Sequence, residues 1–385
     1  MGRKNAKQGA LSRRGFLSQS LVAGVAGTAA LAVAPTPAGA VTSSTKGIPQ
    51  FKADGTYETV PLRSDSITIG IMQTRVMPVD GRNPKPDLRS NLEHMLFAID
   101  AVQGYGGRKD FLAFHEFPLT GWTKWTRKEV LGFAPTVPGE ETERLAAKAK
   151  EYNCYISFGT YAQDPDWPRH VISMSVILGP KGDIVSKQWK HRNIHSAFAE
   201  FELFTSSVYD VLDRFVEMYG WDAVIPVART DIGNICVSPC QWEPELYRAM
   251  AVKGGEILIR TASGGATPDM QVMCRVNRVY GGLSNNSISP GNRYFLESTG
   301  GGGTEIYGPS GEVLAKCATA AEDCAVARIP MAAFRKTHRV PDVYKPLYTH
   351  VLDRSEVRFE PNAFLEHLPE TLEESARYFH DKAKW

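Results

Sequence analysis

Cysteine, basic runs and long apolar runs are all scarce in this sequence. Six cysteines are few for a chain of 385 residues, and the sequence does not decide whether any of them pair. Cys236 and Cys240 are four positions apart, but no pair of histidines stands near them at the spacing of zinc ligands. We therefore expect no metal site, and we expect no cofactor.

The positive charge of the chain is concentrated at its N-terminus. The formal net charge is +2, but the first 40 residues carry five positive charges and no acidic residue, so the remainder has a net charge of −3. That remainder contains no basic run, and no nucleic-acid partner is expected. Hydrophobic residues make up 43% of the chain and charged residues 22%, which excludes a disordered or fibrous class.

The N-terminus has the pattern of an export signal. Ser12–Leu17 (SRRGFL) resembles the twin-arginine motif, and the apolar stretch Leu21–Ala34 follows it. Ala38–Ala40 offers small residues at a plausible cleavage point. The alternative is a basic tail followed by a membrane anchor, but the apolar stretch is shorter than the roughly 20 residues that span a bilayer. We expect residues 1–40 to be a twin-arginine signal peptide, and the mature protein to work without a membrane, in the periplasm or outside the cell.

Strand and helix patterns alternate along the rest of the chain and indicate a layered α/β body. We expect a leader over 41–65, one large domain over 66–335, and an extended tail over 336–385 that contacts a neighbouring subunit. The predicted strands are 66–76, 110–114, 154–161, 171–178, 183–189, 224–228, 232–238, 256–261, 304–307 and 313–316, and the predicted helices are 91–102, 140–151 and 244–253.

Two charged residues stand where predicted strands end. Glu116 lies in FLAFHEFPLTGW (111–122), at the rim of a sheet and among apolar neighbours suited to a general base. Lys190 lies in GDIVSKQWKHRNIH (182–195), where its ammonium can stabilise a developing oxyanion. Taken alone, each has an ordinary alternative: a surface glutamate in a turn, or one solvated lysine in a basic patch.

Cys240 stands between an apolar strand and a helix. The segment TDIGNICVSPCQWEPELYRAMAVKGGEILI (230–259) runs as a strand to Cys240, and a helix begins at Pro244. The free N–H groups at the start of a helix favour a thiolate nearby. A buried structural cysteine is the alternative.

Together these segments resemble the nitrilase superfamily, whose members use a Glu, a Lys and a Cys in that chain order. The resemblance covers roughly 66–332 and includes HEFPLTGW, GPKGDIVSKQWK, PELYRAMAVKGGEILI and GGGTEIYGPSGEVLA. It implies a four-layer α-β-β-α sandwich with subunits paired across a helical face, in a homodimer or larger homo-oligomer. It also implies that Glu116 is the general base, that Cys240 is the nucleophile and that Lys190 stabilises the intermediate.

Two of the departures from the family pattern bear on the choice of site residues. The stretch from Cys240 to the helix-starting proline is two residues shorter than usual, which leaves Cys236 as a rival nucleophile. A second glutamate usually follows the lysine by seven or eight residues, but position 198 is Phe198. Glu200 is therefore the candidate for that role, and Glu202 is the second choice.

The resemblance implies a cysteine hydrolase of a small non-peptide C–N bond, similar to aliphatic amidases, carbamoylases and nitrilases. Its substrate would be an amide or N-carbamoyl amine, cleaved through a thioester with release of ammonia or an amine. Two alternatives remain: a nitrilase that forms a thioimidate, and an inactive scaffold protein that keeps the fold.

Overall fold

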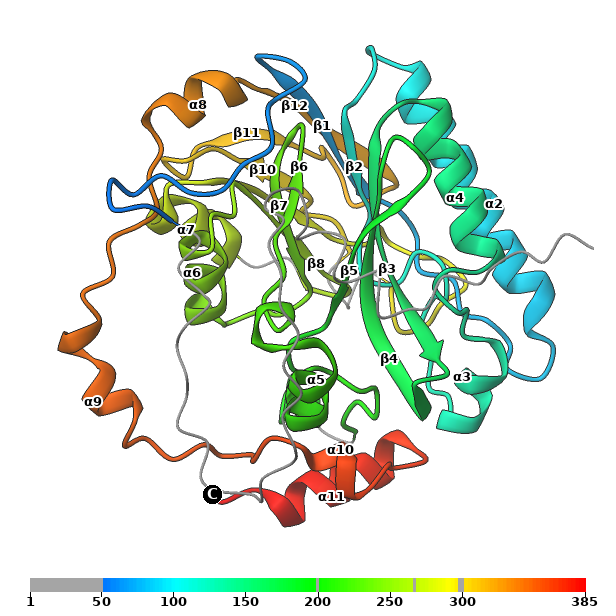
Figure 1. Cartoon of the computed structure of the whole chain (residues 1–385). Coiled ribbons are helices and arrows are strands. Elements are labelled where there is room, and N and C mark those ends of the chain that lie inside the picture. The colour runs from blue at the N-terminus through cyan, green and yellow to red at the C-terminus, as the bar shows by residue number, and fades with distance from the viewer. Residues whose placement is uncertain (1–50, 199–200, 266–267, 297–300) are drawn as a thin grey trace, which may run out of the picture. The chain divides into compact units, whose positions relative to one another are not determined.

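Two six-stranded sheets form the centre of the structure, a computed structural model that describes residues 51–198, 201–265, 268–296 and 301–385 (Figure 1). In spatial order, the first sheet contains β12 (Asp323–Ile329), β1 (Ile67–Gln73), β2 (Phe111–Ala113), β3 (Tyr155–Asp164), β4 (Trp167–Leu178) and β5 (Ile184–Trp189). The second contains β11 (Val313–Lys316), β10 (Glu305–Tyr307), β9 (Tyr280–Ser284), β8 (Ile257–Thr261), β7 (Gly233–Ser238) and β6 (Ala228–Thr230).

The direction of the strands brings the ends of β2 and β5 to one edge. Strands β1, β2 and β3 run parallel, as do β7, β8 and β9. Strand β4 is antiparallel to β3 and β5 is antiparallel to β4, so β5 again runs in the direction of β2 and β3. Glu116 and Lys190, which follow β2 and β5, therefore come to the same edge of the first sheet.

Helices cover the outer face of each sheet. Figure 1 shows α2 (Pro84–Gly104) and α4 (Glu140–Glu151) side by side along the first sheet, and α6 (Pro244–Val252) and α7 (Asp269–Asn277) against the second. These helices join consecutive parallel strands, which need a crossover connection because their ends lie at opposite edges of the sheet. The predicted four-layer α-β-β-α sandwich is confirmed. The remaining α-helices are α3 (Arg127–Phe133), α5 (Leu212–Tyr219), α8 (Met331–Thr337), α9 (Thr349–Leu352), α10 (Ala363–Glu366) and α11 (Leu372–Lys382).

Alternation along the strands separates the apolar cores. Ile69 of β1 and Ile235 and Val237 of β7 belong to the cluster between the two sheets. Cys236, between the latter two, belongs instead to the cluster that β7 forms with α6 and α7. Because successive side chains on a strand point to opposite faces, the same six-residue strand serves two layers.

Several elements differ from the sequence prediction. The predicted strand over 224–228 is wrong: a 3₁₀ turn (Trp221–Ala223) precedes it and the strand begins only at Ala228, since Pro226 cannot donate to a ladder. Helix α2 begins seven residues earlier than predicted, because its two prolines lie in the first turn, where they need no hydrogen-bonded N–H. Strand β12 was not predicted, and its buried residues Ala325 and Ala327 have low strand propensity.

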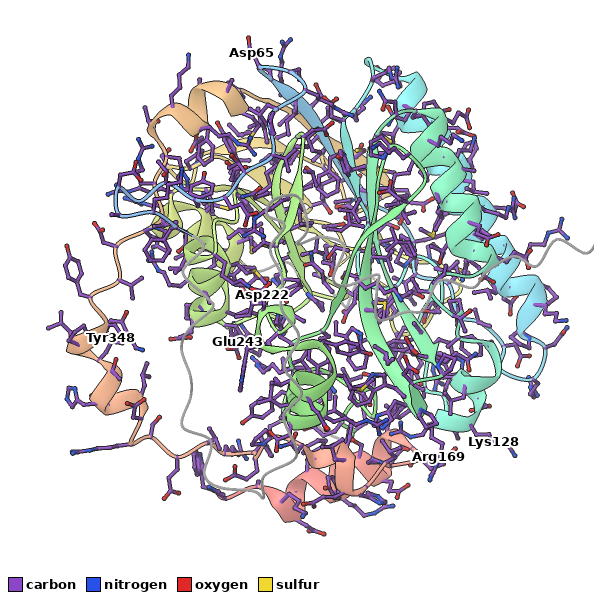
Figure 2. The ribbon with its side chains drawn as sticks, in the orientation of Figure 1. Asp65, Lys128, Arg169, Asp222, Glu243 and Tyr348 are labelled. Carbon is purple, nitrogen blue, oxygen red and sulfur yellow. The ribbon has the colours of Figure 1, made fainter. Side chains whose placement is uncertain are left out.

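The C-terminal segment is not simply an extended tail. Residues 338–362 loop outward from the domain and carry the short helix α9 (Figure 1), and Figure 2 shows Tyr348 on this stretch. Helices α10 and α11 then return to the chain's own domain. Phe364 and Phe379 are buried there against the first sheet's outer core. The apolar spacing of α11 requires that burial, which explains the difference from the expected tail.

Candidate active site

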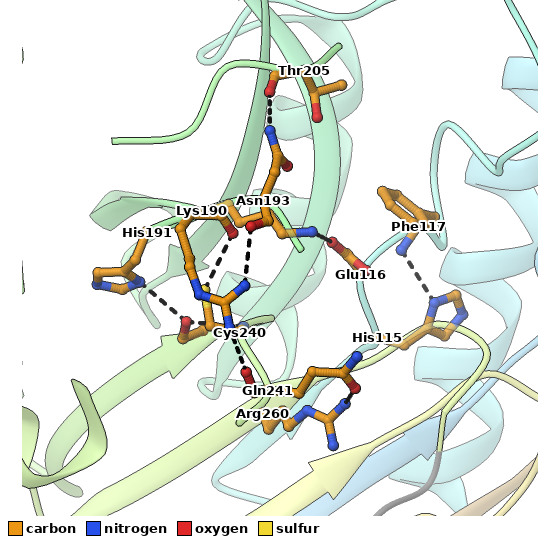
Figure 3. A network of polar contacts seen from close by, with 12 residues as sticks. His115, Glu116, Phe117, Lys190, His191, Asn193, Thr205, Cys240, Gln241 and Arg260 are labelled. Atoms are coloured by element: carbon orange, nitrogen blue, oxygen red, sulfur yellow. Dashed lines mark hydrogen bonds and ion pairs between the residues drawn. The ribbon is translucent and has the colours of Figure 1, made fainter. Parts of the chain in front are cut away.

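Glu116 and Lys190 form a buried ion pair. The Nζ of Lys190 lies 2.9 Å from Oε1 of Glu116, and the two side chains are 8% and 11% exposed (Figure 3). Lys190 is fixed by backbone bonds on both sides: its N–H donates to the carbonyl of Ser173, and its carbonyl accepts the N–H of Val208. Lys190 is therefore not a solvated lysine of a surface patch, and Glu116 is not a surface glutamate.

The turn that carries Glu116 is held by close backbone packing. A Cβ at Gly159 on β3 would lie 2.2 Å from the carbonyl oxygen of Glu116, so only glycine fits there. The preceding carbonyl, of His115, accepts the N–H of Gly159 at 3.1 Å. The Nδ1 of His115 accepts the N–H of Phe117 at 3.2 Å, and burial lowers the pKa of this histidine to about 3, which keeps its ring neutral.

Cys240 lies against the segment that follows Lys190. Its Sγ–H donates to the carbonyl of Arg192 at 3.5 Å, and its N–H donates to Oγ of Ser238 at 3.2 Å. The hydroxyl of Tyr247 on α6 donates to the carbonyl of Cys240 at 2.8 Å, which ties the cysteine to the start of that helix. The edges of the two sheets also meet here, because the N–H of Val237 donates to Oε1 of Gln188 on β5 at 2.7 Å.

The rival thiol of Cys236 lies in a different environment. It is fully buried in the apolar cluster between β7 and helices α6 and α7, and burial raises its pKa to about 12. A thiol of this kind is protonated at neutral pH and is inert. All six cysteines lie within the described part of the chain, and none of them forms a disulfide.

The second glutamate does not appear beside Lys190 in the described residues. Glu200 lies outside them. Glu202 is buried, but its carboxylate accepts the N–H of Ser196 at 2.5 Å and contacts Nδ1 of His195 at 3.3 Å. The ring of His195 in turn lies 4.4 Å from that of Phe359 and 4.2 Å from that of Phe379, measured between centroids. The carboxylate of Glu202 thus holds the loop after Lys190, and His195 joins that loop to the C-terminal segment.

Asp210, a buried carboxylate near the site, was not predicted from the sequence. Its Oδ2 accepts a hydrogen bond from Nδ2 of Asn193 at 3.1 Å. It also accepts hydrogen bonds from the N–H and the hydroxyl of Ser207, at 2.9 and 2.6 Å. Burial raises the pKa of Asp210, while the Ser207 hydrogen bonds and the charge of Lys190 act in the opposite direction. Nothing in the sequence of its aromatic-rich neighbourhood marks this aspartate.

The segment that follows Glu116 joins a buried aromatic cluster, which includes Phe117, Trp122 and Tyr161. Tyr161 is fully buried on β3, and its pKa is raised well above the usual value by burial and then by the charge of Glu116. Trp122 packs against Phe201, Tyr294 and Phe295 with centroid distances of 5.3 to 5.9 Å. Trp125 belongs to the same cluster, whereas Trp189 is buried near α5, and Trp221 and Trp242 are exposed.

The described residues contain no group of three or more His, Cys, Asp or Glu side chains that could hold a metal ion. Within the same residues, no helix is both long enough and apolar enough to cross a membrane.

The family model of carbon-nitrogen hydrolases matches residues 68–339 of this chain. Among curated proteins, the chain is 27% identical to a formamidase of Bacillus cereus over 210 residues, which are 52% of this chain and 55% of the relative. It is 26% identical to a formamidase of Bacillus anthracis over the same length and shares. The chain thus spans about half the length of the curated relatives it matches.

The fold of this chain is similar to that of several solved structures. A double mutant of the amidase from Nesterenkonia sp. AN1 in complex with acrylamide matches with a TM-score of 0.51 and 16% identity, over 76% of this chain and 100% of that one. Another form of that amidase shows Michael addition of acrylamide at the active-site cysteine (TM-score 0.51, 15% identity, 74% and 99%). A carbon-nitrogen hydrolase from Helicobacter pylori G27 matches with a TM-score of 0.54 and 15% identity, over 75% and 95%.

Proposed function

The chain belongs to the carbon-nitrogen hydrolase family, and we propose that it hydrolyses a small amide or N-carbamoyl amine through a thioester on Cys240. The observation that carries the proposal is the buried Lys190–Glu116 ion pair beside the segment that contacts the Cys240 thiol. A buried cation and carboxylate next to a thiol are the groups that nucleophilic acyl transfer needs.

Each residue has a defined step in this mechanism. Glu116 accepts the thiol proton while Cys240 Sγ attacks the carbonyl carbon, and the ammonium of Lys190 stabilises the resulting oxyanion. The proton then passes to the nitrogen, which leaves as ammonia or an amine, and a thioester remains. Glu116 next takes a proton from water, the water attacks the thioester, and the carboxylic acid and free thiol are released.

The relatives support a small amide as substrate. The curated relatives are named formamidases, and the Nesterenkonia amidase is described with acrylamide added at its active-site cysteine. Nitriles remain the second candidate class, since attack of the same thiol on a nitrile gives a thioimidate.

Ammonia release from a panel of amides, N-carbamoyl amines and nitriles tests the proposal. We expect turnover of at least one small amide, and its loss in step with alkylation of Cys240 by iodoacetamide, located by peptide mass spectrometry. Release from nitriles alone would select the second candidate. Full turnover after complete alkylation of Cys240 would contradict its role, and no ammonia from any compound would favour an inactive scaffold.

We also propose that the protein is exported by the twin-arginine route and works in the periplasm or outside the cell. Its support is the sequence of residues 1–40, which lie outside the described part of the chain. In cell fractions, we expect Arg13→Lys with Arg14→Lys to hold the protein in the cytoplasm, because the pathway requires the arginine pair. Arg3→Lys is the matched control. An unchanged location of the double variant would remove the export proposal.

A homo-oligomer is proposed because apolar side chains are exposed on the outlying C-terminal stretch. Leu347 and Val351 are 75% and 57% exposed there, and Val272 and Val276 are exposed on the helical face of α7. Apolar patches of this kind mark interaction surfaces. We expect Leu347→Asp with Val351→Asp to reduce the molar mass measured by light scattering. The same mass for this variant and for a Tyr105→Asp control would refute the contact.

A further inference from the structure

We propose that Arg192 is a positioning residue that holds the nucleophile loop, residues 239–243, in register with Lys190. The proposal rests on the role assigned above to Cys240. Arg192 lies two positions after Lys190, so it belongs to the segment that carries the cation and not to the loop itself. A residue that joins the two parts sets the distance between the thiol and the group that stabilises the oxyanion.

The nucleophile loop needs support from outside. It is the short connection between β7 and α6, and Trp242 adopts a left-handed conformation with φ of 58° while its side chain is largely exposed. The N-cap residue of α6, Glu243, makes no side-chain cap hydrogen bond to the helix. A strained loop without a helix cap is stable only where surrounding contacts fix it.

Arg192 supplies those contacts at Cys240 itself and at two of the three loop residues that follow it. Its Nε pairs with Oε1 of Glu243, and its Nη2 donates to the carbonyl of Gln241 at 3.0 Å. Its own carbonyl accepts the Sγ–H of Cys240 at 3.5 Å, and its Nη1 donates to the carbonyl of Asn193 at 3.0 Å. The planar guanidinium can make these bonds in fixed directions, which an ammonium cannot.

A second guanidinium, that of Arg260, also contacts the loop at Gln241. Nη2 of Arg260 on β8 donates to Oε1 of Gln241 at 2.5 Å, and Nη1 lies 3.5 Å from Oδ2 of Asp269 on α7. Arg260 lies on β8, in the same sheet as the strand β7 that the loop follows. It therefore supports the loop but does not connect it to the segment that carries Lys190. Arg192 is the contact that joins the loop to the lysine segment. The contribution of Arg192 should therefore appear in catalysis more than in stability.

The test compares Arg192→Gln with Arg248→Gln, which removes an exposed guanidinium–carbonyl bond on α6 away from the loop. We expect Arg192→Gln to lower kcat about 10- to 100-fold, the size of effect that misplacement of a reacting group produces, with KM within about twofold. Arg192→Lys should recover only part of kcat. Combining Arg192→Gln with Glu243→Ala should lower kcat no more than the more harmful single substitution does. Both substitutions remove the same contact, that between Arg192 and Glu243.

Thiol labelling tests positioning independently of any substrate. Because Cys240 is only 3% exposed within this loop, we expect a bulky disulfide reagent to label it about fivefold faster or more when Arg192→Gln loosens the loop. Cys236 should remain unlabelled. Unchanged labelling of Cys240 would overturn the proposal, even if no amide is hydrolysed. Labelling of Cys236 at the same time would also overturn it, because it would show a general role in holding the fold.

Discussion

Cys240→Ala is expected to lower ammonia release from amide substrates by about 10⁴-fold or more, because removal of a nucleophile from a group of residues that act together eliminates nearly all of their effect. Cys240 is tied to the chain through its N–H and carbonyl, which alanine retains. We therefore expect the variant to fold as the parent does. Initial rates at saturating substrate measure the loss of activity, and a thermal melt shows whether the variant folds as the parent does.

Cys236→Ala is the matched control. This thiol lies four residues away on the helix-facing side of β7, in an apolar cluster. Its removal should lower the melting temperature slightly through a small cavity and leave kcat unchanged. If activity were instead lost in Cys236→Ala and kept in Cys240→Ala, the nucleophile would have been assigned to the wrong cysteine.

Lys190→Met is expected to reduce kcat by about 10²- to 10³-fold, which is the usual cost of losing one group that stabilises an oxyanion. It should also destabilise the protein by about 3–5 kcal/mol, because it leaves the Glu116 carboxylate buried without its cation. Urea unfolding and initial rates, measured on the same sample, separate the two effects.

The double variant Lys190→Met with Glu116→Leu distinguishes the catalytic role of the pair from its structural cost. Replacement of both charges by apolar groups removes the uncompensated carboxylate, so most of the lost stability should return. Activity should not return, since the general base is also absent. Restored activity in the double variant would mean that the ion pair serves only to hold the fold.

Strand periodicity and strand ends were the parts of this protein that could be predicted from the sequence. Alternating apolar residues are a local signal, and they gave the layered α/β body. The positions of Glu116, Lys190 and Cys240 at strand ends are also local. The same period of two, applied to Ile235, Cys236 and Val237, puts the middle residue on the opposite face from its neighbours, as the structure has it.

Other features depend on residues far apart in the chain. The sequence carries no signal that Asp210 would hold Asn193, or that Glu202 would contact His195 under two phenylalanines of the C-terminal segment. The return of α11 onto its own domain was missed for the same reason. Such contacts are set by how sheets and loops pack, and a window of neighbouring residues does not contain that information.

The sequence by itself therefore determined the layered α/β class and three chemically suitable residues, because each depends on local patterns and their order. Its resemblance to the nitrilase superfamily implied the two-sheet sandwich. Only the tertiary structure decided that Lys190 pairs with Glu116 across 74 positions, and that Arg192 contacts Cys240, Gln241 and Glu243. The reason is that strand direction and loop packing determine which strand ends meet, and both arise from the whole fold.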